Sequence, residues 1–331
     1  MTTGYPTAPT VAGVTFRHAT LPDDLPAMNA LANAVRFEDG QEWVTSAEQF
    51  AEHYVHLINC DPATDIMIAE RDGRLVGYGR ASWKQAQDGH LIYEPTAFAN
   101  VDAGPALLDA VMEAMELRCR QIAATHAPGP KEFETEAEDT ALRRSEILRR
   151  RGYQPVRFFF TMVRSNLDDL PNAPLPDGLE IRDVTPEQLR TVFEAEAEAL
   201  ADEWGFAVPT EADYVHFVSD PVEGDYTLWR VAWDGDQVAG MVRGYINEAE
   251  NDIYGRKRGY VENISVRRPW RRRGLARALI GATIKALRER GMAEGALGVD
   301  TENPSGALRL YERCGFVSVS RNATYRKPLD G

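Results

Sequence analysis

An internal repeat constrains the fold of this chain more than any other feature. Three landmarks occur twice in the same order, with about 162 to 165 residues between the two copies. They are a strand-like segment (14–20 and 179–185), an Asp-Gly turn (Asp72-Gly73 and Asp234-Gly235) and a glycine followed by an aromatic residue (Gly152-Tyr153 and Gly315-Phe316). Self-similarity at one long period indicates a duplicated structural unit. We therefore expect two related domains, which the length of 331 residues also suggests.

The segment Asn166–Gly178 is rich in Pro, Asn and Asp, a composition that is typical of a linker. It places the boundary between the two copies near residue 172. We expect an N-terminal domain over residues 13–171 and a C-terminal domain over residues 172–331. Residues 1–12 lack the basic and apolar regions of a signal peptide. We expect them to form a short disordered lead.

Each copy contains the same succession of strands and helices. An Asp-Gly turn between alternating apolar segments predicts a hairpin, and an apolar stripe at i, i+4 and i+7 predicts a helix after the third strand. In the second copy the predicted elements are strands over Tyr226–Trp233, Gln237–Ile246, Tyr260–Arg267 and Gly295–Asp300, a helix over Gly274–Arg290, and a short helix that ends at Gly315. This order predicts an α/β (α+β) fold in which each domain has a mixed central sheet flanked by helices.

The composition excludes several classes of protein. A formal net charge of −14 opposes binding to a nucleic-acid backbone, and no apolar run reaches the ~18 residues that span a bilayer. Cys60, Cys119 and Cys314 are far apart and form no CxxC motif, so we expect neither a disulfide framework nor a metal site. A cytoplasmic protein fits these features. The acidic balance favours a cationic substrate.

One stretch of this acidic chain is strongly basic: RRPWRRRGLARAL, Arg267–Leu279. Three roles compete for it: a nucleic-acid patch, a solvated surface, or a cradle for one small polyanion. The stretch runs from a strand into Arg-x-x-Gly-x-Ala (Arg271, Gly274, Ala276) and then into a helix. A helix N-terminus attracts anions through its unpaired N–H groups, and small residues let phosphate oxygens approach the main chain. The spacing differs from Walker A and from Gly-x-Gly-x-x-Gly, which argues against a nucleoside triphosphate or a Rossmann site.

The segment NISVRRPWRRRGLARAL resembles the acetyl-CoA signature of the GNAT superfamily of N-acetyltransferases, Val-x-Pro-x-x-Arg/Gln-x-x-Gly-x-Gly/Ala. Pro269 lies one place from the usual Val-x-Pro spacing, whereas Arg271–Ala276 fits. Downstream, Asn303-x-x-x-Ala307-x-x-x-Tyr311-x-x-x-Gly315-Phe316 resembles the second motif of the family. The resemblance covers about residues 179–328. It implies two tandem GNAT-like domains, because two-copy members of the superfamily with an active C-terminal copy are similar in organisation.

The resemblance also implies how acetyl-CoA would bind. Two neighbouring strands, 260–267 and 295–300, would separate and open a slot for the pantetheine arm. Asn303 would contact the cofactor or order its loop, and a simple helix cap is the alternative for it. The implied contacts are Ile264, Ser265 and Val266 along the strand, Arg271, Arg272, Arg273, Gly274, Leu275 and Ala276 around the pyrophosphate, and Asn303. Arg267 and Arg268 have no assigned role, and the adenosine 3′-phosphate is their candidate partner.

Glu262 and Tyr311 are the catalytic candidates that the resemblance supplies. Tyr311 would protonate the leaving thiolate, and Glu262 would act as the general base, directly or through water. A base is needed because an alkylamine, with a pKa of ~10.4, is mostly protonated at pH 7. A core aromatic and a surface carboxylate are the structural alternatives. Asp202, Glu203 and Trp204 belong either to the acceptor site or to a helix end with a surface Trp.

The first copy lacks the corresponding chemistry. When the two copies are aligned on their glycines, Leu148 stands where the second copy has Tyr311. The counterpart of the Arg-rich stretch is Asn100–Leu108, which has Gly104 but no arginine. It also has Asp102, whose charge repels phosphate. We expect the first copy to be a degenerate domain with a structural role.

The sequence thus predicts an acetyl-CoA-dependent N-acetyltransferase with an active C-terminal domain. It would transfer acetyl to a primary amine by direct attack through a tetrahedral intermediate, without a metal. The acceptor would be a small molecule or a peptide amine, and neither its identity nor the oligomeric state can be inferred. Nucleic acids and membranes are not expected partners. The alternative is an acyl-CoA-binding regulatory module without turnover.

Overall fold

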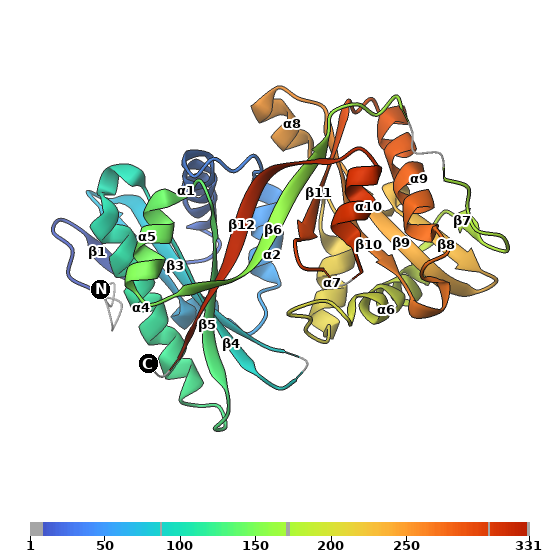
Figure 1. Ribbon diagram of the computed structural model, residues 1–331. Helices are drawn as coiled ribbons and strands as arrows, with labels where there is room; N and C mark the ends of the chain where they lie inside the picture. Colours follow the sequence, from blue (N-terminus) through green and yellow to red (C-terminus); the bar gives the residue numbers. More distant parts are fainter. Residues whose placement is uncertain (1–8, 87, 170–172, 304, 330–331) are drawn as a thin grey trace. The chain divides into compact units, whose positions relative to one another are not determined.

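A computed structural model describes residues 9–86, 88–169, 173–303 and 305–329. The chain forms two compact units (Figure 1). Unit 1 runs to Phe158 and takes in the chain again from Asn322, whereas unit 2 comprises Phe159–Arg321. Most of the expected lead (residues 1–8) and the expected boundary at residue 172 lie outside the described residues. The division into residues 13–171 and 172–331 therefore stays a prediction.

Unit 1 contains a mixed sheet in the order β1-β2-β3-β4-β5-β12. Only β4 and β5 are parallel, and the other neighbours are antiparallel. The elements are β1 (Thr15–His18), α1 (Leu25–Glu38), α2 (Ala47–Val55), α3 (Pro62–Asp65), β2 (Ile66–Arg71), β3 (Arg74–Gln85), β4 (Leu91–Ala99), α4 (Pro105–Ala123), β5 (Lys131–Glu138), α5 (Leu142–Arg150) and the last part of β12 (Val317–Pro328).

Unit 2 repeats this arrangement in the order β6-β11-β10-β9-β8-β7, with β10 and β11 as the parallel pair. The elements are the last part of β6 (Gln154–Arg164), β7 (Glu180–Arg182), α6 (Leu189–Leu200), α7 (Glu211–Ser219), β8 (Arg230–Asp234), β9 (Gln237–Tyr245), α8 (Glu248–Tyr254), β10 (Arg258–Val266), α9 (Leu275–Glu289), β11 (Glu294–Asp300) and α10 (Ala307–Arg313).

The apolar pattern of the strands explains why helices cover both faces of each sheet. Ile66 and Ile68 of β2 pack in a core with α1 and α2, whereas Met67 and Ala69 pack in another core with α4. Successive side chains of a strand point to opposite faces, so this run needs cover on both sides. In unit 2, α6 and α7 cover one face, and α9 and α10 cover the other. The predicted fold class is confirmed.

The last strand of each sequence repeat pairs with the sheet that the other repeat forms. Phe159–Arg164 of β6, from the first repeat, pairs antiparallel with β11. Asn322–Pro328 of β12, from the second repeat, pairs antiparallel with β5. The sequence does not indicate this exchange, because the backbone groups of an edge strand pair with any extended partner of suitable pattern.

The predicted strands and the long helix of the second repeat agree with the structure to within two residues, with one exception, and the short helix expected over residues 304–315 spans Ala307–Arg313. The strand expected from Tyr226 begins only at Arg230, so this part of the prediction is wrong. Residues Tyr226–Leu228 instead form a 3₁₀ turn. The physical reason is local, because the side chain of Asp225 accepts a hydrogen bond of 3.1 Å from the backbone N–H of Thr227.

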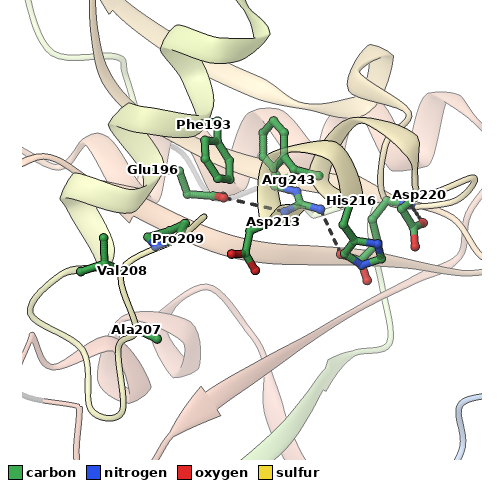
Figure 2. Close-up of a pocket in the computed structure, with 11 residues that line it drawn as sticks. Phe193, Glu196, Ala207, Val208, Pro209, Asp213, His216, Asp220 and Arg243 are labelled. Carbon is green, nitrogen blue, oxygen red and sulfur yellow. Dashed lines mark hydrogen bonds and ion pairs between the residues drawn. The ribbon is translucent and has the colours of Figure 1, made fainter. Parts of the chain in front are cut away.

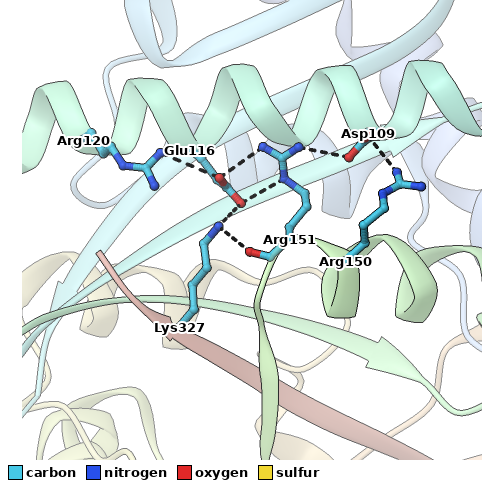
Figure 3. A network of polar contacts seen from close by, with 6 residues as sticks. All are labelled: Asp109, Glu116, Arg120, Arg150, Arg151 and Lys327. Carbon is cyan, nitrogen blue, oxygen red and sulfur yellow. Dashed lines mark hydrogen bonds and ion pairs between the residues drawn. The ribbon is translucent and has the colours of Figure 1, made fainter. Parts of the chain in front are cut away.

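A buried ionic network holds β12 in unit 1 (Figure 3). Glu116 of α4 is 2% exposed and accepts hydrogen bonds from Arg151 at 3.2 Å and from Lys327 at 2.8 Å. Burial by itself would raise the pKa of the Glu116 carboxyl. The hydrogen bonds from the two cations outweigh burial and lower this pKa below its ordinary value of 4.5.

Glu116→Gln should destabilise the protein by about 3 kcal/mol, because Arg151 and Lys327 lose the carboxylate that lies between them. Chemical denaturation at pH 7 measures the free energy of unfolding, and Glu113→Gln, at an exposed position of the same helix, is the control. The folded-state pKa of Glu116 is lowered, so its contribution is present above pH 4.5 and is lost as the pH falls through the folded value. Equal stability of the two variants at pH 7 would show that the network contributes nothing.

Candidate active site

The parallel strands of unit 2 separate part-way along their length. The ladder of β10 and β11 ends at Tyr260 and Ala296, and no further pair of the two strands is seen among the described residues. Immediately beyond, β10 has a β-bulge at which Asn263 adopts a φ of 48°. A bulge adds an unpaired residue and bends its strand. The separation expected between these strands is therefore present, and the bulge is its structural cause.

Glu262 lies at the start of this opening. Its carboxylate accepts a hydrogen bond of 2.8 Å from the backbone N–H of Gly298 on β11. Burial raises the pKa of the Glu262 carboxyl to about 8, the Gly298 hydrogen bond opposes this rise, and the charge of Glu223 adds to it. Arg243 on β9 is the cross-strand neighbour of Glu262. A carboxyl group with such a pKa can exchange a proton near neutral pH.

Tyr311 of α10 is in the same electrostatic environment. Its side chain is 7% exposed, and it packs in the core under α9 and α10. Burial raises the pKa of its phenol above the ordinary value of 10, and the negative charges of Glu262 and Glu203 raise it further. The hydroxyl therefore stays protonated across the neutral range, as a proton donor must. The packing of a core aromatic and the chemistry of a proton donor are compatible at this position.

The segment after β10 consists of a 3₁₀ turn (Arg268–Trp270), the arginine loop (Arg271–Arg273) and the N-terminus of α9. Trp270 is buried and anchors the turn through a hydrogen bond of 2.9 Å to Asp234. Arg272 and Gly274 adopt left-handed φ values of 62° and 86°. Left-handed residues before a helix direct successive N–H groups to one side and so form an anion-binding concavity.

The main chain at the start of α9 is open to a ligand. Among the described residues, no atom lies within 4 Å of the point where a Cβ of Gly274 would stand. Leu275 is buried in the core of unit 2, so the first turn of α9, which includes Ala276, is anchored to the sheet. Arg273 donates a hydrogen bond of 3.1 Å to the backbone carbonyl of Asp177. The concavity is thus held from both sides.

The arginine side chains of this stretch bind acidic residues at the end of α6. Arg267 pairs with Glu198 at 2.7 Å, and Asp202 accepts hydrogen bonds from both Arg268 and Arg271. These two hydrogen bonds lower the pKa of the Asp202 carboxyl. The three side chains therefore pair with carboxylates in the structure, and their predicted roles toward acetyl-CoA stay predictions. Asp202, a candidate for the acceptor site, holds the arginine loop.

Ile264, Ser265 and Val266 form the part of β10 beyond the bulge. The backbone N–H of Arg267 donates to Ala239 on β9. Alternate residues of a strand direct their backbone groups to opposite sides, so those of Val266 point toward the gap from which β11 has separated. The arginine loop already donates a hydrogen bond of 2.9 Å to the Val266 carbonyl.

Asn303 orders the turn before α10. Its side-chain oxygen accepts a hydrogen bond of 2.9 Å from the backbone N–H of Ser305, and its amide donates to Glu203 at 3.4 Å. An ordering role is one of those that the sequence suggested for Asn303. Trp204, the third residue of the acidic cluster after α6, packs against Phe159 with 6.4 Å between the ring centroids.

A cavity of about 220 Å³ lies between α6, α7 and β9 (Figure 2). Its charged lining consists of Glu196, Asp213, Asp220, Glu223 and Arg243. Arg243 donates to Glu223 at 3.0 Å and lies 3.7 Å from the carboxylate of Glu196. Burial raises the pKa of the Glu196 carboxyl to about 7, and the charge of Arg243 opposes this rise. Arg243 lines this cavity and is the cross-strand neighbour of Glu262, so the charges of the cavity act on the carboxyl group at the strand opening.

Sequence reasoning missed this cavity. Glu196 belongs to the run EAEAEAL, in which Glu194 and Glu198 are exposed and Glu196 is buried. The available signal was helical periodicity, because Glu196 is four residues after the buried Val192 and therefore on the apolar stripe of α6. Arg243, inside a predicted strand, gave no comparable signal.

Unit 1 shows the same strand separation and fills it with its own side chains. The parallel ladder of β4 and β5 ends after three residue pairs. Arg143 and Arg144 of α5 donate hydrogen bonds to the carbonyls of Ala99 and Ala97 on β4. Where unit 2 exposes main chain between its separated strands, unit 1 has guanidinium groups.

Unit 1 also lacks the arginine loop. Gly104 precedes α4 with a φ of 84°, as Gly274 precedes α9 with a φ of 86°. In unit 1, however, the 3₁₀ turn Val101–Ala103 is followed directly by this glycine. The three residues Arg271–Arg273 are thus an addition peculiar to the second repeat.

The described residues contain no group of three or more His, Cys, Asp or Glu side chains that is arranged to hold a metal ion. None of their helices combines the length and the apolar character that crossing a bilayer requires.

Comparison with known proteins identifies the family. Residues 190–316 match the model of the Acetyltransferase (GNAT) family. The chain is 27% identical to a mycothiol acetyltransferase of Salinispora arenicola, over 97% of this chain and 99% of the relative. It is also 42% identical to the N-alpha-acetyltransferase MAK3 of Arabidopsis thaliana over 64 residues, which span 33% of that protein.

Solved structures resemble the chain along its whole length. A GCN5-related N-acetyltransferase from Sphaerobacter thermophilus aligns with a TM-score of 0.68 and 25% identity, over 97% of each chain. A tandem GNAT protein from the clavulanic acid biosynthesis pathway aligns with a TM-score of 0.67 and 13% identity, over 96% of this chain and 99% of that chain. Together with the open strand pair, the glycine-bounded anion concavity and the duplicated sheet, these matches show a GNAT acetyltransferase domain over residues 190–316 in a chain that is similar along its whole length to tandem GNAT proteins.

Proposed function

We propose that unit 2 transfers an acetyl group from acetyl-CoA to a primary amine. The observation that carries this proposal is Glu262, a carboxyl group with a raised pKa at the start of a strand opening, whose cross-strand neighbour Arg243 lines an acidic cavity. Full-length similarity to mycothiol acetyltransferases supports a small-molecule acceptor. Similarity to the MAK3 enzyme covers only 19% of the chain and supports a protein acceptor less.

The residues of unit 2 fit acetyl-CoA. The N–H groups from Arg272 to Ala276 would bind the pyrophosphate, because Gly274 leaves the main chain open and the left-handed turns align these donors. The backbone of Ile264–Val266 would bind the pantetheine arm in the gap between β10 and β11. The side chain of Arg271 would act indirectly, since it holds the loop against Asp202 and Val266.

Glu262 and Tyr311 would carry out the two proton transfers. Glu262 would remove a proton from the ammonium group of the acceptor, and the neutral nitrogen would attack the thioester carbonyl. As the C–N bond forms and the C–S bond breaks, Tyr311 would give its proton to the sulfur. The direction of both pKa shifts suits these roles, because Glu262 becomes basic enough to accept a proton and Tyr311 stays protonated.

Unit 1 would not bind acetyl-CoA. Arg143 and Arg144 occupy its strand gap, and the turn before Gly104 has no arginine loop. We propose a structural role for this unit, in agreement with the absence of a tyrosine at position 148.

One prediction concerns the rate of acetyl transfer. In wild-type protein, kcat/KM for an amine should rise about tenfold per pH unit up to about pH 8 and then level off, because Glu262 must lose its proton first. Glu262→Gln should lower kcat about 100-fold or more and remove this break. Release of the CoA thiol over pH 6–10 is the measurement. A break near pH 8 that persists in the variant would assign the pKa to another group.

Tyr311→Phe provides the matched test of the proton donor. It should lower the rate of thiol release and leave the affinity for acetyl-CoA, measured by titration calorimetry, near that of the wild type. If wild-type protein binds acetyl-CoA but releases no thiol with any amine, the chain is an acyl-CoA-binding module and the proposed transfer is wrong.

Another prediction concerns the pH dependence of the free energy of unfolding. The folded-state pKa of Glu262, about 8, exceeds its ordinary value of 4.5, so the folded state favours the protonated form. The stability that this proton provides is complete below pH 4.5 and is lost as the pH rises through 8. Glu262→Gln keeps the neutral form, and it should be more stable than wild type by on the order of 2–4 kcal/mol at pH 9 and similar at pH 4. Thermal melts at the two pH values are the measurement, and equal stability of variant and wild type at pH 9 would contradict the raised pKa of Glu262.

A further prediction compares the effect of two equivalent glycines on the affinity for acetyl-CoA. Gly274→Asp should weaken acetyl-CoA binding at least about tenfold, because a carboxylate would face the pyrophosphate at the concavity. Gly104→Asp is the matched control in unit 1, since this glycine also has a left-handed φ and precedes the equivalent helix. It should leave the affinity unchanged at one site per chain. An equal loss in both variants would place a second acetyl-CoA site in unit 1.

A further inference from the structure

The acidic cavity of unit 2 contains a buried carboxylate with an unused acceptor. Glu196 is 7% exposed and lines the cavity (Figure 2). Its Oε1 atom has no hydrogen-bond partner among the described residues. Burial of an unpaired charged oxygen is costly, and a ligand that donates a charge-assisted hydrogen bond would remove this cost.

Arg243 does not satisfy this carboxylate. Its guanidinium lies 3.7 Å from Glu196, whereas it donates a hydrogen bond of 3.0 Å to Glu223. It also lies over the ring of Phe217, with 4.8 Å between the guanidinium carbon and the ring centroid. One cation is thus divided between two carboxylates and an aromatic face, and its closer partner is Glu223.

The rest of the cavity adds negative charge. Asp213 accepts hydrogen bonds from Thr210 through one oxygen, and Asp220 accepts them from Val222 and Glu223. These bonds come from neutral backbone and hydroxyl donors. Four acidic side chains therefore line a cavity whose basic residues are one arginine, Arg243, and one histidine, His216. An anionic ligand would be repelled, and a cationic one attracted.

The remaining walls are apolar. Phe193, Val208 and Pro209 face the same cavity from α6 and the segment before α7. An aliphatic chain would be shielded from water against these side chains. The cavity thus combines an apolar wall with a buried carboxyl group whose Oε1 atom has no hydrogen-bond partner among the described residues, and Arg243, which also lines the cavity, is the cross-strand neighbour of Glu262.

We propose that the acceptor is an aliphatic diamine. One amino group reaches Glu262 and is acetylated, and the second, as an ammonium ion, donates a hydrogen bond to Glu196 while the methylene chain lies along the apolar wall. This assignment rests on the proposed function for the first amino group. The recognition of the second ammonium rests only on the cavity.

The test compares three amines of similar length: cadaverine, pentylamine and aminocaproate, which end in an ammonium, a methyl and a carboxylate group. Calorimetry on the full chain with CoA present measures binding, and thiol release from acetyl-CoA measures turnover. Cadaverine should bind at least about tenfold more tightly than pentylamine, and aminocaproate more weakly than either. In Glu196→Gln the affinity for cadaverine should fall to that for pentylamine.

Glu289→Gln is the matched control, because Glu289 is a largely exposed acid on α9 that pairs only with Lys285 among the described residues. It should leave the preference for cadaverine intact. The affinity of each variant for acetyl-CoA verifies that unit 2 is folded, and the ratio of the three amines in wild-type protein is informative without any variant.

The outcomes separate the two proposals. Equal affinity for cadaverine and pentylamine in wild-type protein, or a preference for aminocaproate, would overturn the diamine assignment even if thiol is released. Cadaverine binding that depends on Glu196 but releases no thiol would support the cavity's role and contradict the proposed transfer.

Discussion

The site depends on the interrupted ladder between β10 and β11. While the two strands pair, their main-chain groups are satisfied by each other, and no ligand can enter between them. The bulge at Asn263 ends this pairing, so backbone groups become available and a carboxylate can stand between the strands. Glu262 bridges the gap through the N–H of Gly298. The raised pKa of Glu262 follows from the same geometry, because the carboxyl group at this opening is buried and lies near the charge of Glu223.

Charge is distributed unevenly to serve this opening. Three arginines of the basic stretch, Arg267, Arg268 and Arg271, pair with Glu198 and Asp202 at the end of α6. This pairing links the helix that lines the acidic cavity to the loop that precedes α9. Inside the site, in contrast, carboxylates outnumber cations, and burial raises the pKa values of Glu196 and Glu262. Such groups reduce stability above neutral pH, a cost that is common at functional sites.

The two units show how one architecture can leave the strand gap open in one copy and filled in the other. Both have a parallel strand pair that separates, a glycine with a left-handed φ before a long helix, and a short helix that follows the next strand. Their differences are few and local. In unit 1, Arg143 and Arg144 fill the strand gap, and the three-residue arginine loop is missing. The exchange of last strands makes each unit incomplete without the other repeat, which favours retention of both copies.

The sequence by itself determined the duplication, the fold class, most element boundaries and the motif of the GNAT superfamily, because these follow from local periodicity, turn residues and short-range spacing. It placed Glu262 and Tyr311 on the correct strand and helix. Only the tertiary structure decided which carboxylates meet. Glu196 and Glu223 come from separate segments that nothing in the linear pattern connects, and Arg243 unites them across the sheet. The exchanged strands and the occupied arginine side chains were likewise decided by long-range contacts, since a backbone edge or a guanidinium has many partners of equal local preference.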